Sequence, residues 1–189
     1  MRITGGKRLG HRIQVPAVSD LRPSQDIVRE AVFQILGDVR NLTVLDIYAG
    51  TGAMGLEALS RGAKFCDFVE HEPNACQTIQ TNLRGAGLED TADIYCEEAE
   101  KFATEEHPQK YNLVFLDPPY AARPRSVIRN LPGLLSDKGT IVYLHNQRIV
   151  LDENPDREWI ADRLQVADKR RYGATHVSFL KKREVRGEK

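Results

Sequence analysis

Short apolar segments alternate with amphipathic ones along most of this chain, and the alternation limits the possible folds. Segments typical of β-strands cover residues 42–48, 65–70, 92–96, 111–117 and 139–146. Segments with the spacing of helices lie between them, at 53–62, 73–87, 97–106 and near 125–135. Strands that are joined by helices pair in parallel, with the helices packed on both faces of the sheet.

The two ends of the chain add to this pattern. Residues 164–182 predict two strands around a turn at Tyr172, Gly173 and Ala174, so an antiparallel pair closes the sheet. Residues 19–36 predict a helix with Pro23 in its first turn and Gly37 after its end. Six residues of that helix are apolar at helical spacing, namely Ile27, Val28, Ala31, Val32, Ile35 and Leu36.

The predicted fold class is therefore α/β. We expect a Rossmann-like, seven-stranded and mostly parallel sheet with helices on both faces, an antiparallel C-terminal hairpin and a small basic N-terminal extension. The expected division places the extension, as a hairpin or loop, at 1–20 and one main domain at 21–189.

Composition favours a single intracellular domain. The 189 residues are 41% hydrophobic, which is enough for one core, and no apolar run approaches the roughly 20 residues of a membrane span. The first residues lack the apolar segment of a signal peptide, so we expect a cytoplasmic protein. Cys66, Cys76 and Cys96 are odd in number and have no CxxC spacing. We expect them to be small buried hydrophobic residues, without a disulfide and without a metal site.

Charge is unevenly distributed although the net charge is zero. Residues 1–29 have six basic and two acidic side chains, and residues 169–189 have eight basic and two acidic. Residues 38–117 have six basic and fifteen acidic. Two basic ends around an acidic middle suit contact with a polyanion, although solvated chain ends would have the same composition.

The first strand runs into a glycine-rich loop. Gly50, Gly52 and Gly55 form GxGxxG, a pattern that brings a ligand close to the backbone at the start of a helix. In a dinucleotide site such a loop holds a pyrophosphate. Asp46, four residues before the first glycine, would repel a pyrophosphate and attract an ammonium. This carboxylate favours a ligand with a cationic amino-acid part, such as S-adenosylmethionine.

Acidic residues also follow the second and third strands. Glu70 ends the second strand, and its two carboxylate oxygens could accept both hydroxyls of a ribose. Glu98 follows the third strand and could accept a hydrogen bond from an adenine amino group, with Phe102 packed below it. An acidic first helical turn, favoured by the helix dipole, would explain Glu98 equally well. Glu72 is interpreted as surface charge.

The fourth strand ends in Asp117, Pro118, Pro119 and Tyr120. The two prolines lack N–H groups and cannot continue the ladder, so they fix the Asp117 carboxylate and the Pro118 carbonyl at the strand end. Two fixed acceptors suit the two N–H bonds of a planar amino group. Tyr120 offers a face on which the base that bears this amine could stack, a contact of about 1–3 kcal/mol.

Taken together, these segments resemble a class I S-adenosylmethionine-dependent methyltransferase of the group marked by (D/N)PP(Y/F), and more closely the RsmD family. The resemblance covers nearly the whole chain. It rests on RITGGKRLGHRI, RPSQDIVREAVFQIL, VLDIYAGTGAMGLEALSRGA, FVEHEP, FLDPPY and YGATHVSFLKK. The chain departs from the family at Tyr48, where a phenylalanine is common, and at Glu98, where many methyltransferases have aspartate.

This resemblance implies methyl transfer from S-adenosylmethionine to the exocyclic N2 of a guanine in 16S ribosomal RNA. It implies that Asp117 to Tyr120 hold the guanine, and that the helix with Arg22 and Arg29 covers the cofactor; ion pairs to Asp26 or Glu30 are the alternative for Arg29. The residues that it implies for cofactor binding are Asp46, Ala49, Gly50, Thr51, Gly52, Glu70, Glu98 and Ala99.

The expected partner is 16S rRNA, free or in a 30S particle or assembly intermediate, bound by a monomer without a metal. The basic ends would hold it through Arg2, Lys7, Arg8, His11, Arg12, Arg22, Lys169, Arg170 and Arg171. Three alternatives stay open at this point. They are an adenine-N6 or cytosine-N4 methyltransferase for DNA or another RNA, a nucleotide-binding oxidoreductase, and an RNA-binding assembly factor without activity.

Overall fold

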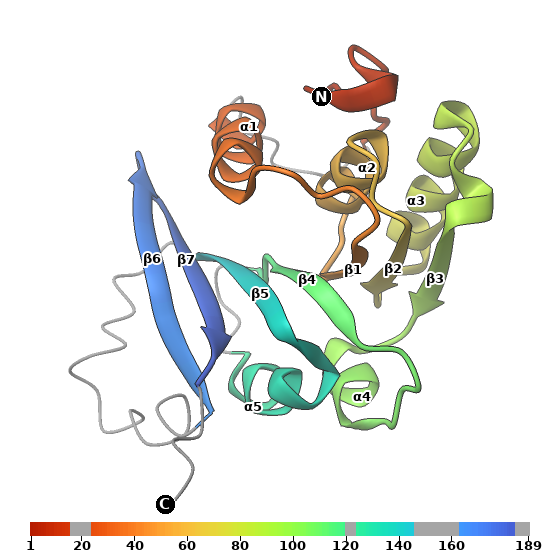
Figure 1. Ribbon diagram of the computed structural model, residues 1–189. Helices are drawn as coiled ribbons and strands as arrows, with labels where there is room; N and C mark the ends of the chain where they lie inside the picture. The colour runs from red at the N-terminus through yellow and green to blue at the C-terminus, as the bar shows by residue number, and fades with distance from the viewer. Residues whose placement is uncertain (16–23, 120–123, 146–162, 184–189) are drawn as a thin grey trace, which may run out of the picture.

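Helices and strands alternate along the chain in this computed structural model, which describes residues 1–15, 24–119, 124–145 and 163–183 (Figure 1). The α-helices are α1 (Ser24–Leu36), α2 (Ala53–Ser60), α3 (Pro73–Ala86), α4 (Ala99–Thr104) and α5 (Arg125–Leu134). Two short 3-10 helices are η1 (Gly6–Arg8) and η2 (Glu89–Thr91). The strands are β1 (Thr43–Ile47), β2 (Phe65–Glu70), β3 (Ala92–Cys96), β4 (Tyr111–Leu116), β5 (Leu135–His145), β6 (Leu164–Tyr172) and β7 (Thr175–Lys182).

The strands form one seven-stranded sheet in the order β3-β2-β1-β4-β5-β7-β6. β1 to β5 are parallel, whereas β7 is antiparallel to both β5 and β6. The direction of strand succession reverses between β1 and β4, the place where open α/β sheets bind ligands at the carboxyl ends of their strands. The predicted fold class, including the C-terminal hairpin, is confirmed.

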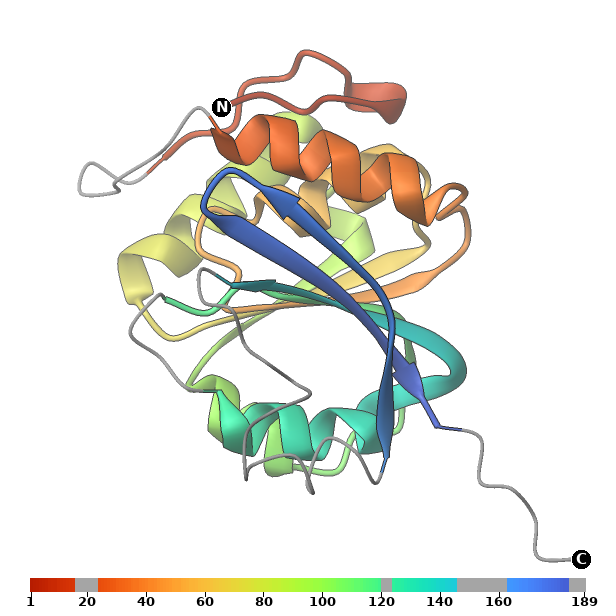
Figure 2. The same ribbon diagram turned by 90° about the vertical axis from the view of Figure 1, so that its left-hand side faces the viewer.

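Helices cover both faces of the sheet. α1, α2 and α3 lie on one face, and α4 and α5 lie on the other (Figures 1 and 2). Each face has its own buried core, one that includes Val32, Phe33 and Phe115 and one that includes Phe102 and Leu131. Within the described ranges, no helix combines the length and the apolar character needed to cross a bilayer.

Two local predictions differ from the structure. The sequence predicts a helix near 125–135 and then a strand at 139–146, but α5 ends at Leu134 and β5 begins directly after it, at Leu135. On α1, Val28 and Val32 are buried as the spacing predicts, but Ile27 is 66% exposed and Ile35 is 38% exposed. The buried stripe of α1 is therefore narrower than the apolar spacing indicates. Pro23 lies outside the described residues.

The basic N-terminal segment folds back on itself and packs on the domain. Residues 1–13 pair as a hairpin, in which Ile3 N donates to His11 O at 3.0 Å and Ile13 N donates to Met1 O at 3.1 Å. Ile3 and Ile13 are buried in the same core as α1 and α2. The hairpin lies along α1 in Figure 2, with its N-terminal end and its η1 turn at opposite edges of the sheet.

A buried carboxylate fastens this hairpin to the domain. Glu57 of α2 is fully buried and accepts hydrogen bonds from Thr4 N at 2.8 Å and Thr4 Oγ at 2.9 Å. The same carboxylate pairs with Arg29 Nε of α1 at 3.2 Å and with Arg61 Nε at 2.7 Å. Arg29 also contacts Asp26 at 3.1 Å, so the ion-pair alternative for this arginine is confirmed.

The prediction for the cysteines is wrong in part. Cys66 is free and buried, as expected, but Cys76 and Cys96 form a disulfide. Cys76 lies in the first turn of α3 and Cys96 ends β3, and the β2–α3–β3 connection brings their Cα atoms to 6.0 Å. A sequence separation of 20 residues gives no hint of this proximity, which is a consequence of the fold.

Gly55 is required for close packing of α2 on β2. A Cβ atom at this position would lie 2.3 Å from the Phe68 ring and 2.7 Å from Cys66 Sγ. We therefore expect Gly55→Ala to lower the free energy of unfolding by about 1–3 kcal/mol, measured by urea denaturation. Gly133→Ala is the matched control, because a Cβ there meets no atom within 4 Å. Equal losses in both variants would contradict this packing role.

Candidate active site

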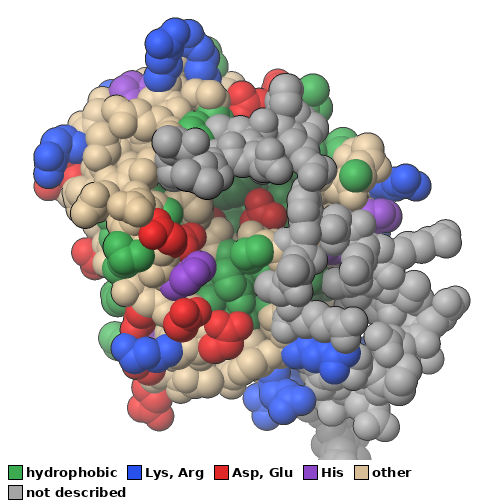
Figure 3. All heavy atoms as spheres, turned by 180° about the vertical axis from the view of Figure 1, so that it is seen from behind, with side chains coloured by type: hydrophobic (Ala, Val, Ile, Leu, Met, Phe, Trp, Pro, Cys, Tyr) green, Lys and Arg blue, Asp and Glu red, His purple; other side chains and the backbone are tan. Residues whose placement is uncertain are grey.

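The carboxyl ends of the central strands bring the predicted acidic residues to one edge of the sheet. Asp46 lies on β1, and Glu70 is the last residue of β2. Asp117 directly follows β4, in which Leu116 pairs with Ile47 of β1. Viewed from this edge, the molecule has a hollow with hydrophobic and acidic side chains, and the Lys and Arg side chains lie at its periphery (Figure 3).

The glycine-rich loop turns tightly between β1 and α2. Gly50 and Gly52 have φ of 57° and 75°, in the left-handed region that glycine adopts without strain. Gly52 N donates to Ala49 O at 2.7 Å, which closes the turn around Thr51. A Cβ added at Gly50 would have no atom within 4 Å. The loop therefore leaves open space beside its backbone.

Asp46 is buried beneath this loop. Its Oδ2 accepts a hydrogen bond from Gly55 N at 2.8 Å in the first turn of α2. Burial raises the pKa of Asp46 to about 8, and the charges of Asp117 and Glu70 add to the increase, although the Gly55 N–H opposes it. The ionised form of Asp46 is therefore disfavoured at neutral pH unless a cation lies beside it, so this buried carboxyl group suits a cationic ligand.

Glu70 links the loop to the end of β2. Its Oε2 accepts a hydrogen bond from Gly50 N at 2.8 Å, and its Oε1 accepts from His71 N at 2.9 Å and from Glu72 N at 3.0 Å. These bonds fix the carboxylate beside the loop while Oε2 keeps a free lone pair. Glu72, interpreted from the sequence as surface charge, is exposed, and it also caps α3 by accepting from Ala75 N at 3.0 Å.

Glu98 lies at the start of α4 with its side chain exposed. It is the N-cap residue of α4 and makes no side-chain capping bond, a position that agrees with the helix-dipole alternative as well as with a ligand contact. Ala99 begins α4 and is buried, and Phe102 is fully buried below, as expected. The loop after β3 therefore presents an exposed carboxylate, that of Glu98, next to the buried first residue of α4.

Tyr48 is a site residue that the sequence flags only as a departure from the family. It adopts φ of 63°, uncommon for a residue other than glycine and typical of functional sites. Its hydroxyl donates to Glu100 Oε1 at 2.9 Å, so it ties the end of β1 to α4. Burial, followed by the neighbouring Glu100, raises the pKa of Tyr48. No periodicity in the sequence predicts this backbone conformation.

Asp117 is a carboxylate of this site without a partner among the described residues. Among the described residues it makes no hydrogen bond and no ion pair, and it is exposed at the carboxyl end of β4. Partial loss of solvation at this position raises its pKa to about 6. Pro118 is buried and Pro119 is exposed. Tyr120 lies outside the described residues.

The raised pKa of Asp117 gives a pH prediction. Its ordinary value is 3.8, so between that value and about 6 the carboxyl group is protonated where a solvated aspartate would be ionised. The protonated form is the weaker acceptor for N–H groups. For the methyl transfer that the resemblance implies, we expect kcat/KM to fall about tenfold per pH unit below about 6. The Asp117→Asn variant should lack this acidic limb, and a wild-type profile that is flat down to about pH 5 would contradict the assignment.

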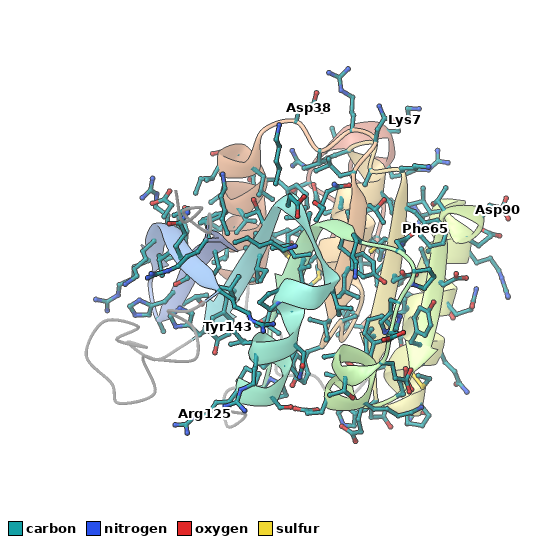
Figure 4. The ribbon with its side chains drawn as sticks, turned by 60° about the horizontal axis from the view of Figure 1, so that its bottom comes forward. Lys7, Asp38, Phe65, Asp90, Arg125 and Tyr143 are labelled. Carbon is teal, nitrogen blue, oxygen red and sulfur yellow. A yellow bond between two sulfur atoms is a disulfide. The ribbon has the colours of Figure 1, made fainter. Side chains whose placement is uncertain are left out.

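The predicted RNA-binding residues of the N-terminal hairpin lie mostly away from this site. Figure 4 shows Lys7 on the same side as Phe65, which starts β2, and Asp90, toward the amino ends of the parallel strands. Arg125, at the start of α5, lies on the opposite side. Arg8 and His11 lie near Lys7, since Arg8 N donates to Ser60 Oγ at the end of α2 and His11 lies beside Gly85 near the end of α3. Arg2 and Arg12 pair with each other in an isolated antiparallel bridge, and Arg22 lies outside the described residues.

The C-terminal cations lie on opposite faces of β6. Arg170 pairs with Val177 and Arg171 pairs with His176 of β7. Val177 belongs to the core under α1, so Arg170 points to that face, where it bonds to Asp168. Lys169 and Arg171 share the other face, the one that α5 covers. The hairpin turn adjoins the carboxyl end of β5 and therefore the edge at which Asp117 lies.

Comparison with known proteins agrees with this geometry. The model of the family described as Conserved hypothetical protein 95 matches residues 1–181. The Bacillus subtilis (strain 168) protein described as "Putative rRNA methyltransferase YlbH" is 33% identical over 189 residues, covering 97% of this chain and all of that protein. The Escherichia coli (strain K12) "Ribosomal RNA small subunit methyltransferase D" is 32% identical over 153 residues, covering 78% of this chain and 75% of that protein.

A solved structure extends the likeness to the whole fold. The Escherichia coli structure titled "Putative methyltransferase yhhF" superposes with a TM-score of 0.82 at 27% identity. That superposition covers 98% of this chain and 99% of the other. With the hollow at the switch point, the glycine loop and the unpartnered aspartate before two prolines, these matches agree on one assignment. The chain belongs to the Conserved hypothetical protein 95 family, which is the RsmD family of methyltransferases.

Proposed function

We propose that this protein transfers a methyl group from S-adenosylmethionine to the exocyclic N2 of a guanine in small-subunit (16S) ribosomal RNA. The observation on which the proposal depends is the unpartnered Asp117 carboxylate at the hollow. A carboxylate that loses solvation without gaining a partner is costly, and such groups are typical of sites that await a ligand. The two relatives described above support the rRNA substrate, since one is named a putative rRNA methyltransferase and the other a ribosomal RNA small subunit methyltransferase.

The residues around the glycine loop fit the proposed cofactor. Three neighbouring carboxyl groups, Asp46, Glu70 and Asp117, suit a ligand with an ammonium and a sulfonium, whose positive charge would favour the ionised form of the buried Asp46. The open space beside Gly50 gives that ligand room against the backbone. We assign the methionine part to Asp46, Ala49, Gly50, Thr51 and Gly52. Glu70 would accept the ribose hydroxyls, and Glu98 with Ala99 would hold the adenine edge.

In the mechanism, Asp117 and Pro118 orient the target amine. The Asp117 carboxylate and the Pro118 carbonyl accept the two N–H bonds, which withdraws the nitrogen lone pair from conjugation with the ring. The rigid pair Pro118 and Pro119 keeps these acceptors in place, and Tyr120 stacks on the base. When bound, S-adenosylmethionine supplies an activated methyl group on a sulfonium. Asp117 then holds the proton that the alkylated amine loses.

The target base must leave its stack to reach Asp117, which costs least in a loop or unpaired segment. We propose that basic side chains hold the surrounding RNA, with Arg170 and Arg171 nearest the site. Arg2, Lys7, Arg8, His11 and Arg12 extend the contact across the hairpin toward the far edge of the sheet. The separation of these side chains from the site favours a large structured substrate, such as a 30S particle. We propose that a monomer binds this substrate in the cytoplasm.

Substrate choice tests this proposal. Purified protein is incubated with methyl-labelled S-adenosylmethionine and, separately, with naked 16S rRNA, small-subunit particles and duplex DNA. We expect label in rRNA or particles and none in DNA. Label in DNA alone would favour the alternative amino methyltransferase. Binding of S-adenosylmethionine without label in any substrate would favour an assembly factor.

A further inference from the structure

A row of side chains runs across the sheet from the neighbourhood of Asp117 to the C-terminal hairpin formed by β6 and β7. Tyr143 and His145 lie two residues apart on β5, so they share one face. His145 pairs with His176 of β7, and His176 pairs with Arg171 of β6. Residues directly opposite in antiparallel strands share a face. We call Tyr143, His145, His176 and Arg171 the imidazole row.

The rings in this row are in contact. The ring centroids of Tyr143 and His145 are 4.7 Å apart, and those of His145 and His176 are 5.5 Å apart with an interplanar angle of only 16°. His145 Nε2 lies 3.1 Å from Ser178 Oγ, which holds the inner imidazole in place. The inner ring therefore forms a rigid support for the outer one.

Exposure increases along the row. Tyr143 is 3% exposed and His145 is 8% exposed, whereas His176 is half-buried and Arg171 is exposed. In the described part of the chain, the ring nitrogens of His176 have no hydrogen-bond partner. Arg171 Nε donates to Gly173 O at 2.9 Å, which fixes the guanidinium at the hairpin turn and leaves its terminal nitrogens for another acceptor.

The row begins next to the proposed catalytic residue. Tyr143 pairs with Leu116, the residue before Asp117. β7 lies two strand spacings from β4, which is about 10 Å. His176 is thus close enough to contact the nucleotide beside a base held at Asp117. A stack that only filled the core would end in a buried ring, but this one ends in an open imidazole and a cation.

We propose that His176 and Arg171 bind the nucleotide adjacent to the methylated guanine. The exposed face of the His176 imidazole stacks on the neighbouring base, and the Arg171 guanidinium pairs with its phosphate. Imidazole stacking tolerates any base, whereas the fixed guanidinium sets where the backbone passes. This inference rests on the proposed function, since it assigns the path of the same RNA.

The His176→Ala variant tests the stacking contact. We expect KM for the RNA to rise about 5- to 150-fold with little change in kcat and no change in S-adenosylmethionine affinity. His176→Phe should restore most of the loss, because it keeps a stacking face. The matched control is Lys181→Ala, an exposed cation at the far end of β7, which should change KM less than about twofold.

A fluorescent base separates stacking from a structural effect. With 2-aminopurine next to the target guanine, binding of wild-type protein should quench its emission, and binding of His176→Ala should not. Arg171→Ala should lower the dependence of log affinity on log salt by about 0.7–0.9, the value for one lost phosphate contact. An unchanged KM in His176→Ala, or a loss that phenylalanine does not restore, would overturn the inference. If wild-type protein labels no rRNA, the proposed function fails instead.

Discussion

Replacing Asp117 with alanine is expected to lower the rate of methyl transfer by at least about 100- to 1,000-fold, the usual cost of removing one oriented group from a transition state. The variant loses the acceptor that orients the amine and receives its proton. S-adenosylmethionine should still bind with nearly the wild-type Kd, because the glycine loop and Glu70 keep their contacts. Single-turnover rates with labelled cofactor and calorimetric titration measure the two quantities separately.

The Asp117→Asn variant serves as the control for this experiment. Its amide oxygen can still accept one N–H bond, so we expect a rate between those of wild type and alanine. Its profile should also lack the acidic limb near pH 6. If the alanine variant kept wild-type turnover, Asp117 would not hold the amine. If it lost cofactor affinity to the same extent as turnover, the aspartate would belong to the cofactor pocket.

The largest expected effect on stability comes from Glu57. This fully buried carboxylate neutralises Arg29, itself 2% exposed, and receives both polar groups of Thr4. Glu57→Ala would leave the Arg29 guanidinium buried with Asp26 as its remaining ion-pair partner. Breaking a buried pair in this way costs about 3–5 kcal/mol. We therefore expect a large fall in the urea midpoint of unfolding.

The same substitution should release the N-terminal hairpin. Hydrogen exchange at Ile3, Gly10 and Ile13, whose amides close the hairpin, should be faster in Glu57→Ala. Asp38→Ala is the matched control, because it removes a carboxylate from an exposed ion pair with Arg40 and should leave the midpoint nearly unchanged. Equal effects of the two variants would show that Glu57 does not fasten the hairpin.

The sequence predicts the sheet and the strand ends because both depend on local pattern. Apolar runs that end in Asp46, Glu70 or Asp117 require only period and order along the chain, and parallel strands then bring the ends together. The end of the fourth strand at Asp117 is local as well, because the two prolines that follow lack N–H groups and cannot continue the ladder. These features of the site could be predicted before any coordinates.

Other features depend on contacts between distant segments. The Cys76–Cys96 disulfide results from the packing of α3 beside β3, and the burial of Arg29 results from its contact with Glu57, 28 residues away. The left-handed backbone of Tyr48 and the stack of His145 on His176 have no sequence signal of their own. The basic N-terminal segment was predicted from charge, but only its docking on α2 explains why Lys7 lies far from the site.

Identification of the methylated nucleoside tests the central claim most directly. Small-subunit particles that carry the labelled methyl group are digested to nucleosides and separated by liquid chromatography with mass spectrometry. If the Asp117 carboxylate and the Pro118 carbonyl accept the two N–H bonds of an exocyclic amine, the label will be found in N2-methylguanosine. Label on a ring nitrogen, on carbon or on a ribose oxygen would contradict that geometry.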